Sequence, residues 1–117
     1  MVKGIAFTAY SVSDVPKARA FYRDVIGLKE SDMAGDHWTE FDVGGSTFGI
    51  GNGTELGIKP GTSFSATFEV DDINAMQKKL KDQGVKVSDV HETPVCWVAF
   101  VTDPEGNQFG IHQAKPR

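Results

Sequence analysis

Two short segments of this sequence resemble each other in one frame, and they constrain the fold more than any other feature. Residues 42–50 read Asp-Val-Gly-Gly-Ser-Thr-Phe-Gly-Ile, and residues 103–111 read Asp-Pro-Glu-Gly-Asn-Gln-Phe-Gly-Ile. Each pattern predicts a tight turn that Asp begins and Gly completes, followed by a strand whose Phe and Ile point to one face. We therefore expect two copies of a unit that ends in this hairpin.

The residues around these hairpins repeat one order of elements. In the first copy, alternation and capping signals predict a strand over 5–12, a helix from the cap at Ser13-Asp14 to Gly27, and strands over 28–31, 37–43 and 47–51. In the second copy they predict a strand over 63–70, a helix from Asp71-Asp72 to Gly84, and strands over 85–88, 95–102 and 107–113. The sequence thus predicts an α+β fold of two βαβββ modules, 1–51 and 63–117, joined by a Gly-rich connector over 52–62.

Length and charge limit what such a chain can be. At 117 residues it is long enough for one domain with a real core and too short for two independent ones, so the modules are expected to share one domain over 1–117. The net charge of -4 and scattered lysines argue against nucleic acid as a partner. No apolar run approaches the roughly 20 residues of a membrane span, the N-terminus lacks a signal-peptide pattern, and Cys96 is the lone cysteine. These features predict a cytoplasmic protein without a membrane partner.

The two faces of the predicted strands differ in chemistry. One alternating set is apolar and suits packing under the helices: Phe48, Ile50, Ala66, Phe68, Val70, Phe109 and Ile111. The opposite set is small, polar or aromatic and is expected to line a ligand cleft; it contains Phe7, Trp38, Glu40, Ser65, Thr67, Trp97, Gln108 and His112, with Ala9 and Ala99 beside them. The alternative is an exposed sheet face that binds nothing. Aromatic residues beside glycines favour the cleft.

Several short motifs together resemble one known family. The motifs are Ala20-Phe21-Tyr22 and Gly27-Leu28 after the helix start at Asp14, the Gly44-Gly45 hairpin, Phe68-Glu69-Val70-Asp71-Asp72, and Asp103-Pro104-Glu105-Gly106-Asn107. In these the chain resembles the vicinal oxygen chelate superfamily, which groups glyoxalase I, bleomycin-resistance proteins and extradiol dioxygenases. The resemblance implies paired βαβββ modules that form a cup-shaped mixed sheet around a cavity, usually in a homodimer. It leaves the activity open, because the fold hosts lyases, dioxygenases, epimerases and drug binders.

The resemblance also implies where a metal would bind. Metalloenzymes of the family hold a divalent metal through His, Gln or Glu on the first and last strands of the modules, and the matching positions here are Phe7, Gly49, Ser65 and Gly110. None is a usual ligand, since Phe and Gly offer no donor atom and a lone serine hydroxyl binds transition metals poorly. We therefore expect no metal cofactor. A displaced divalent metal on Glu40 and His112, or a metal-free acid–base pair of the same two residues, stays open.

The leading hypothesis is a metal-independent small-molecule-binding protein of the bleomycin-resistance type. Its ligand would be a planar or aromatic compound held between Trp38 and Trp97. Cys96 is expected to be a buried thiol that points away from the cleft rather than a nucleophile. The alternative is an enzyme, a lyase, isomerase or dioxygenase of glyoxalase type, and whether the protein is catalytic is left open.

Overall fold

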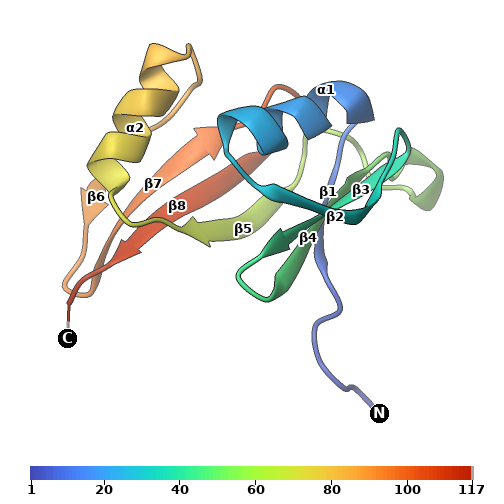
Figure 1. Ribbon diagram of the computed structural model, residues 1–117, viewed down its shortest axis with the longest axis horizontal. Helices are drawn as coiled ribbons and strands as arrows, with labels where there is room; N and C mark the ends of the chain where they lie inside the picture. Colours follow the sequence, from blue (N-terminus) through green and yellow to red (C-terminus); the bar gives the residue numbers. More distant parts are fainter. Residues whose placement is uncertain (117) are drawn as a thin grey trace. The chain divides into compact units, whose positions relative to one another are not determined.

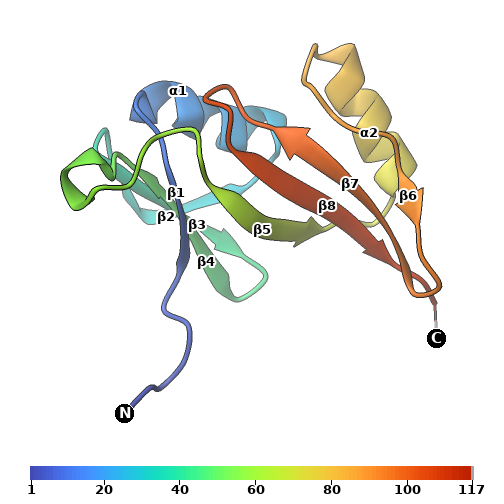
Figure 2. The same cartoon turned by 180° about the vertical axis from the view of Figure 1, so that it is seen from behind.

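A computed structural model describes residues 1–116, which form two compact units, 1–63 and the residues from Phe64 onward (Figures 1 and 2). Each unit holds one four-stranded mixed sheet and one main helix. The predicted α+β fold of two βαβββ-like modules is therefore confirmed. No helix within residues 1–116 is long and apolar enough to cross a membrane.

Unit 1 contains the first module and the connector. Its elements are β1 (Thr8–Ser11), α1 (Val15–Ala20), η1 (Phe21–Val25), β2 (Lys29–Ala34), β3 (Trp38–Val43), β4 (Ser46–Gly51) and η2 (Thr54–Leu56). The sheet order is β1-β4-β3-β2, with β1 parallel to β4 and the other pairs antiparallel. Helix α1 contacts β3 and β4.

The helix of unit 1 begins and packs as its sequence predicts. The Asp14 carboxylate accepts a hydrogen bond from Lys17 N at 3.0 Å, which satisfies a free amide of the first turn. The helix widens into the π-helical turns of η1, where Phe21 and Tyr22 are both buried. The Tyr22 ring lies 5.2 Å from that of Phe48, so the helix is fixed on the core face of the sheet.

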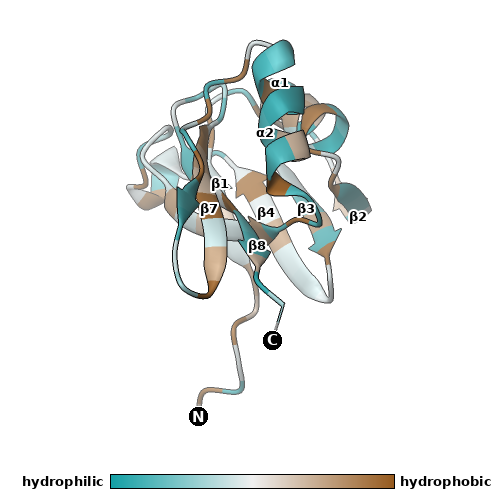
Figure 3. Ribbon diagram, turned by 90° about the vertical axis from the view of Figure 1, so that its left-hand side faces the viewer, coloured by the Kyte–Doolittle hydropathy of each residue, from teal (hydrophilic) through white to brown (hydrophobic). Residues whose placement is uncertain are grey.

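Unit 2 repeats this architecture. Its elements are β5 (Phe64–Glu69), α2 (Ile73–Asp82), β6 (His91–Glu92), β7 (Cys96–Thr102) and β8 (Gln108–Ala114), in the sheet order β5-β8-β7-β6. The Asp72 side chain caps α2 by accepting from Ala75 N at 3.0 Å, and Ile73 and Leu80 are buried. Along β4, hydrophobic residues alternate with residues of intermediate hydropathy (Figure 3).

The strand predicted over 85–88 was wrong. Only Val87 forms a single bridge, to Val101, and the last strand of the sheet is β6 at His91–Glu92. The Ser88 hydroxyl accepts from Phe100 N at 2.9 Å, so a side chain takes the place of a backbone partner there. This side-chain bond explains why the segment follows β7 without forming a regular ladder.

The two hairpin turns that the paired segments predict are present but built differently. In the first, Gly44 and Gly45 adopt φ of 54° and 85°, as a tight two-residue hairpin turn requires. In the second, Asp103 Oδ1 accepts from Glu105 N and Asn107 N, both at 2.9 Å, and Oδ2 accepts from Asn107 Nδ2 at 3.0 Å. The Asp-Pro-Glu-Gly-Asn motif is therefore a buried structural turn.

The faces predicted for three residues of β7 were wrong. Trp97 pairs with Gln113 and Ala99 with Ile111, so both lie on the face that α2 covers. Gln113 marks this face, because its Oε1 accepts from Ile73 N at the start of α2. Cys96 pairs with Ala114 and lies on the opposite, open face. The turn length sets this register, and a shift by one residue exchanges the two faces of a strand.

Candidate ligand-binding site

The open face of the unit 1 sheet brings together three of the residues expected in a cleft. Trp38 pairs with Gly51 and Glu40 with Gly49, on the face opposite the buried Phe41 and Phe48. Phe7 directly precedes β1, and its ring meets the Trp38 ring edge-on at a centroid distance of 5.4 Å. This face therefore carries aromatic rings beside glycines, as the sequence predicts.

The Trp38 indole lies directly against β4 because that strand has no side chains there. A Cβ atom at Gly49 would lie 2.5 Å from Trp38 Cζ2, and one at Gly51 would lie 2.5 Å from Trp38 Cε3. Trp38 Nε1 donates to Glu40 Oε2 at 2.8 Å, which fixes the ring in its plane. The indole is thus positioned before any ligand arrives.

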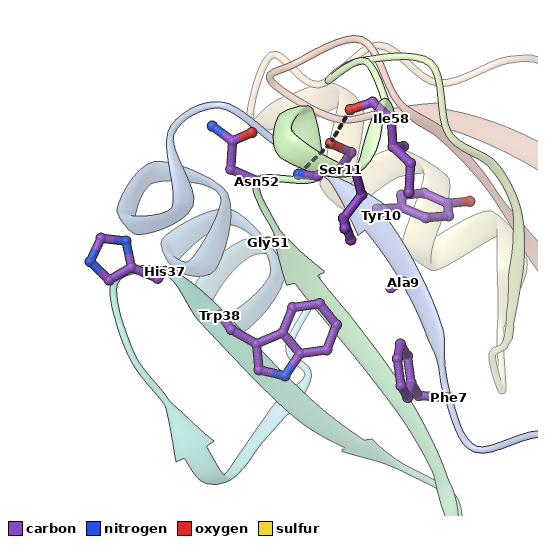
Figure 4. Close-up of a pocket in the computed structure, with 11 residues that line it drawn as sticks. Phe7, Ala9, Tyr10, Ser11, His37, Trp38, Gly51, Asn52 and Ile58 are labelled. Carbon is purple, nitrogen blue, oxygen red and sulfur yellow. Dashed lines mark hydrogen bonds between the residues drawn. The ribbon is translucent and has the colours of Figure 1, made fainter.

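A cavity of about 330 Å³ opens beside this ring (Figure 4). We call it the aromatic pocket and define its apolar walls as Phe7, Trp38, Leu56 and Ile58. Polar groups from Ser11, His37 and Asn52 also reach its lining. Leu56 is 82% exposed and Ile58 is 49% exposed, so the pocket presents apolar surface to solvent.

The connector forms one side of the aromatic pocket, and sequence reasoning missed this. The Ser11 hydroxyl donates to Ile58 O and accepts from Gly53 N, each at 3.1 Å, which ties the connector to the end of β1. The sequence signal was the presence of Leu56 and Ile58, two apolar side chains in a segment otherwise rich in Gly and polar residues.

The family's divalent metal does not fit the four positions that the resemblance implies. Phe7 has no donor atom, and the space in front of Gly49 is filled by the Trp38 ring. In front of Gly110, a Cβ atom would lie 2.8 Å from Thr67 Oγ1. Within residues 1–116, no three His, Cys, Asp or Glu side chains are grouped so that they could hold a metal ion.

In unit 2, Thr67, Gln108 and His112 lie on the open face of the sheet. Thr67 pairs with Gly110, and Gln108 and His112 share its face along β8. Ser65 is exposed and falls where the register of β5 shifts, between Phe64 and Thr67. A cavity of about 230 Å³ lies over this part of the sheet; it is lined by Phe64, Ser65, Ala66, Thr67, Phe100, Gln108, Phe109 and Gly110.

The two candidate acid–base residues each have a partner within their own unit. Glu40 accepts from Trp38, and His112 Nδ1 lies 2.5 Å from Glu69 Oε1. The amide of Ala114, followed by the His112 ring, lowers the pKa of Glu69 below its usual value. The pairing of Glu40 with His112 stays a prediction. The structure adds Glu69 as the partner of His112, which sequence reasoning missed.

The remaining candidate residues either make contacts within their own unit or are exposed to solvent. The Trp97 ring lies 5.0 Å from Lys115 Nζ, which also pairs with Glu92. Cys96 is buried as predicted, with its Sγ 3.1 Å from Thr93 Oγ1. His37 and His91 are exposed.

Paired βαβββ modules, each with an uncovered sheet face, define the glyoxalase fold as the class of this protein. The family model described as Glyoxalase/Bleomycin resistance protein/Dioxygenase superfamily matches residues 4–111. The chain therefore belongs to this superfamily, which confirms the resemblance seen in its motifs.

Solved structures of the same fold include binders and enzymes. TnmS3, an antibiotic binding protein from Streptomyces sp. CB03234, is 26% identical over 97% of this chain and 98% of its own, with a TM-score of 0.83. A glyoxalase/bleomycin resistance protein from the same organism is 28% identical over 94% of this chain and 100% of its own, with a TM-score of 0.80. A lactoylglutathione lyase from Agrobacterium tumefaciens is 21% identical over 96% of this chain and 94% of its own, with a TM-score of 0.80; it shows the shared fold alone.

Proposed function

We propose that this protein binds small planar aromatic compounds in the aromatic pocket without the help of a metal ion. The observation that carries the proposal is the Trp38 ring, which lies across Gly51 and across Gly49, one of the positions where the family resemblance implies a metal ligand. An aromatic surface replaces a donor atom at that position. Such a surface recognises a ligand by stacking and burial rather than by coordination.

The geometry of the pocket supports tight binding of a flat compound. Glu40 and Phe7 hold the Trp38 ring, so little side-chain freedom is lost when a ligand stacks on it. Leu56 and Ile58 supply exposed apolar area that a ligand would cover, and burial of such area contributes roughly 25 cal/mol per Å². The volume of about 330 Å³ suits a ligand of a few fused rings.

The similar solved structures also support small-molecule binding. TnmS3 binds an antibiotic and is similar over nearly the whole length of this chain. An aromatic pocket in the first module gives this chain its own means of holding a natural product. The cytoplasmic location and the homodimer that the resemblance implies stay predictions; sedimentation of the purified chain would measure the second.

The two tryptophans give the test a matched control. A panel of fused-ring aromatic compounds is titrated while intrinsic fluorescence is recorded for the wild type, Trp38→Phe and Trp97→Phe. We expect quenching to persist in Trp97→Phe, because Trp97 lies on the helix-covered face, and to vanish in Trp38→Phe. Calorimetry of Trp38→Ala is expected to show binding about tenfold weaker or worse. Quenching that depends on Trp97, or an unchanged affinity in Trp38→Ala, would show that the proposed site is wrong.

The alternative is an enzyme of glyoxalase type, and the observation that favours it is the contact between Glu69 and His112, which resembles an oriented acid–base group. Metal analysis of protein purified without chelator separates the two functions. Near-stoichiometric Ni, Zn, Fe or Mn would favour the enzyme and contradict metal-independent binding.

A further inference from the structure

The pair of His112 and Glu69 lies on the open face of unit 2 and has no part in the aromatic pocket. We propose that this pair forms the polar anchor of a second binding site, which takes a ligand with an acidic hydroxyl group such as a phenol. The site is a cavity of about 300 Å³ lined by Pro94, Val95, His112, Ala114, Lys115 and Pro116.

The strand register places the two side chains together. Strands β5 and β8 run parallel, and Glu69 is the register partner of His112. Glu69 Oε1 contacts His112 Nδ1, and Glu69 Oε2 accepts from Ala114 N at 2.8 Å. Both carboxylate oxygens are therefore used, one to hold the backbone of β8 and one to hold the imidazole.

This arrangement decides which nitrogen of His112 is free to act. The amide of Ala114 and the imidazole both favour the ionised form of Glu69 and keep its pKa low. A carboxylate can only accept, so the proton of the contact belongs to His112 Nδ1. In the neutral ring the lone pair then lies on Nε2, which becomes a hydrogen-bond acceptor.

The walls of this cavity suit an aromatic ring with one donor. Pro94, Val95 and Pro116 are apolar, and Val95 is 72% exposed. Lys115 also lines the cavity, and its ammonium is engaged by Glu92 and by the Trp97 ring. The His112 side chain is 31% exposed and so can be reached from the cavity.

The charged groups around His112 are few. Glu69 on β5 touches it, and Lys115 directly follows the end of β8. His91 on β6 shares its face, since His91 pairs with Val98 and Val98 with His112. The phenol O–H would donate to Nε2. If the phenol is acidic enough, its O–H bond breaks and the proton moves to Nε2, which leaves an imidazolium beside a phenolate. The Glu69 carboxylate then stabilises the imidazolium.

The probe for this site is 4-nitrophenol, because its absorbance differs between phenol and phenolate. The matched control compound is 4-nitroanisole, which has the same ring and no hydroxyl. We expect 4-nitrophenol to shift the nitrogen NMR signal of His112 Nε2 and, when affinity is measured from the His112 signals, to bind about tenfold tighter than 4-nitroanisole. Equal binding of the two compounds would overturn the proposal.

Substitutions of His112 and Glu69 test whether these two residues bind 4-nitrophenol. His112→Gln is expected to weaken 4-nitrophenol binding about tenfold, and Glu69→Gln about threefold, because the amide keeps the shape of the side chain and loses its charge. Trp38→Ala, which removes the aromatic pocket, is expected to leave the His112 signal unchanged. An unchanged affinity in His112→Gln, or a signal lost in Trp38→Ala, would contradict the proposal.

One measurement needs no variant. Nitrogen NMR of the free wild-type protein reports which ring nitrogen of the neutral His112 carries the proton. We expect it on Nδ1, and a proton on Nε2 would overturn the inference even if His112→Gln failed to fold. Failure of this proposal leaves metal-independent binding at Trp38 intact, since the two sites use different residues.

Discussion

The open faces of the two units share a backbone plan and differ in the side chain that covers one glycine. Each unit contains Phe-Gly-Ile in its last long strand, with the glycine at Gly49 or Gly110. The Trp38 ring fills the space before Gly49, whereas the Thr67 hydroxyl fills the space before Gly110. A repeated module therefore keeps its strand geometry while a neighbouring strand decides whether the face is aromatic or polar.

The turns before these glycines differ in a similar way. Asp103 is 4% exposed and accepts hydrogen bonds from the backbone amides of Glu105 and Asn107 and from the Asn107 side chain. Its counterpart Asp42 is exposed, and among residues 1–116 no hydrogen bond to its side chain is found. The same residue type at the same place in the repeat is thus buried and hydrogen-bonded in one unit and exposed in the other.

The largest expected effect tests this difference between the turns. Asp103→Ala leaves the amides of Glu105 and Asn107 without their acceptor, and Asn107 is fully buried, so we expect the free energy of unfolding to fall by about 3 kcal/mol. Asp42→Ala is expected to change it by less than about 0.5 kcal/mol. Urea denaturation measures both. Similar losses in the two variants would mean that the turns are equivalent after all.

A smaller effect on stability is expected when Gly49 or Gly110 is replaced by alanine. In Gly49→Ala the new methyl group must displace the rigid Trp38 ring, and we expect a loss of about 1 to 3 kcal/mol in stability together with weaker binding of aromatic ligands. In Gly110→Ala it meets the short and exposed Thr67 side chain, which can rotate, so a smaller loss and unchanged binding are expected. Denaturation and calorimetry measure the two quantities.

A double-mutant cycle sharpens this test. If Gly49→Ala acts through the indole, its cost should largely disappear when Trp38 is already Ala. Full additivity of the two changes would show that the alanine disturbs the strand itself. The comparison between the two open faces would then lose its basis in side-chain packing.

Features that depend on local sequence could be predicted. Asp14 and Asp72 cap their helices as expected, because a cap involves residues only three positions apart. The two hairpin turns were also found, since Asp and Gly act within the turn itself. The family resemblance rests on these same local motifs.

Features that depend on strand register or on other long-range contacts could not be predicted from the sequence. Strand β7 reads Cys-Trp-Val-Ala-Phe-Val-Thr and is apolar on both alternating sets, so its pattern does not say whether Trp97 faces the helix. The pairing of Glu69 with His112 arises from two parallel strands far apart in the sequence. The folding of Leu56 and Ile58 against β1 depends on hydrogen bonds to Ser11, another long-range contact.

The smallest expected effect concerns how each helix is tied to its unit. In unit 1 the Glu30 side chain on β2 is 17% exposed and pairs with Arg19 of α1 at 2.7 Å and with Arg23 of η1 at 3.1 Å. In unit 2 the Lys78 and Asp82 pair lies within α2 and is exposed on both sides. Only the first pair network joins a helix to a strand, so it should contribute more to stability.

This difference should appear as a pH dependence. The hydrogen bond from Arg19, with help from Arg23, lowers the pKa of Glu30 below its usual value. A group with a lowered folded-state pKa stabilises the fold above its unfolded-state pKa, about 4.3, and this stabilisation is lost as pH falls through the folded-state value. Glu30→Gln is therefore expected to cost about 0.5 kcal/mol at neutral pH and to differ little from wild type below about pH 3. Asp82→Asn is the control and should follow the wild type throughout. Urea midpoints recorded across this range measure the effect, and a Glu30→Gln curve parallel to the wild type would show that the helix of unit 1 is held by its apolar face alone.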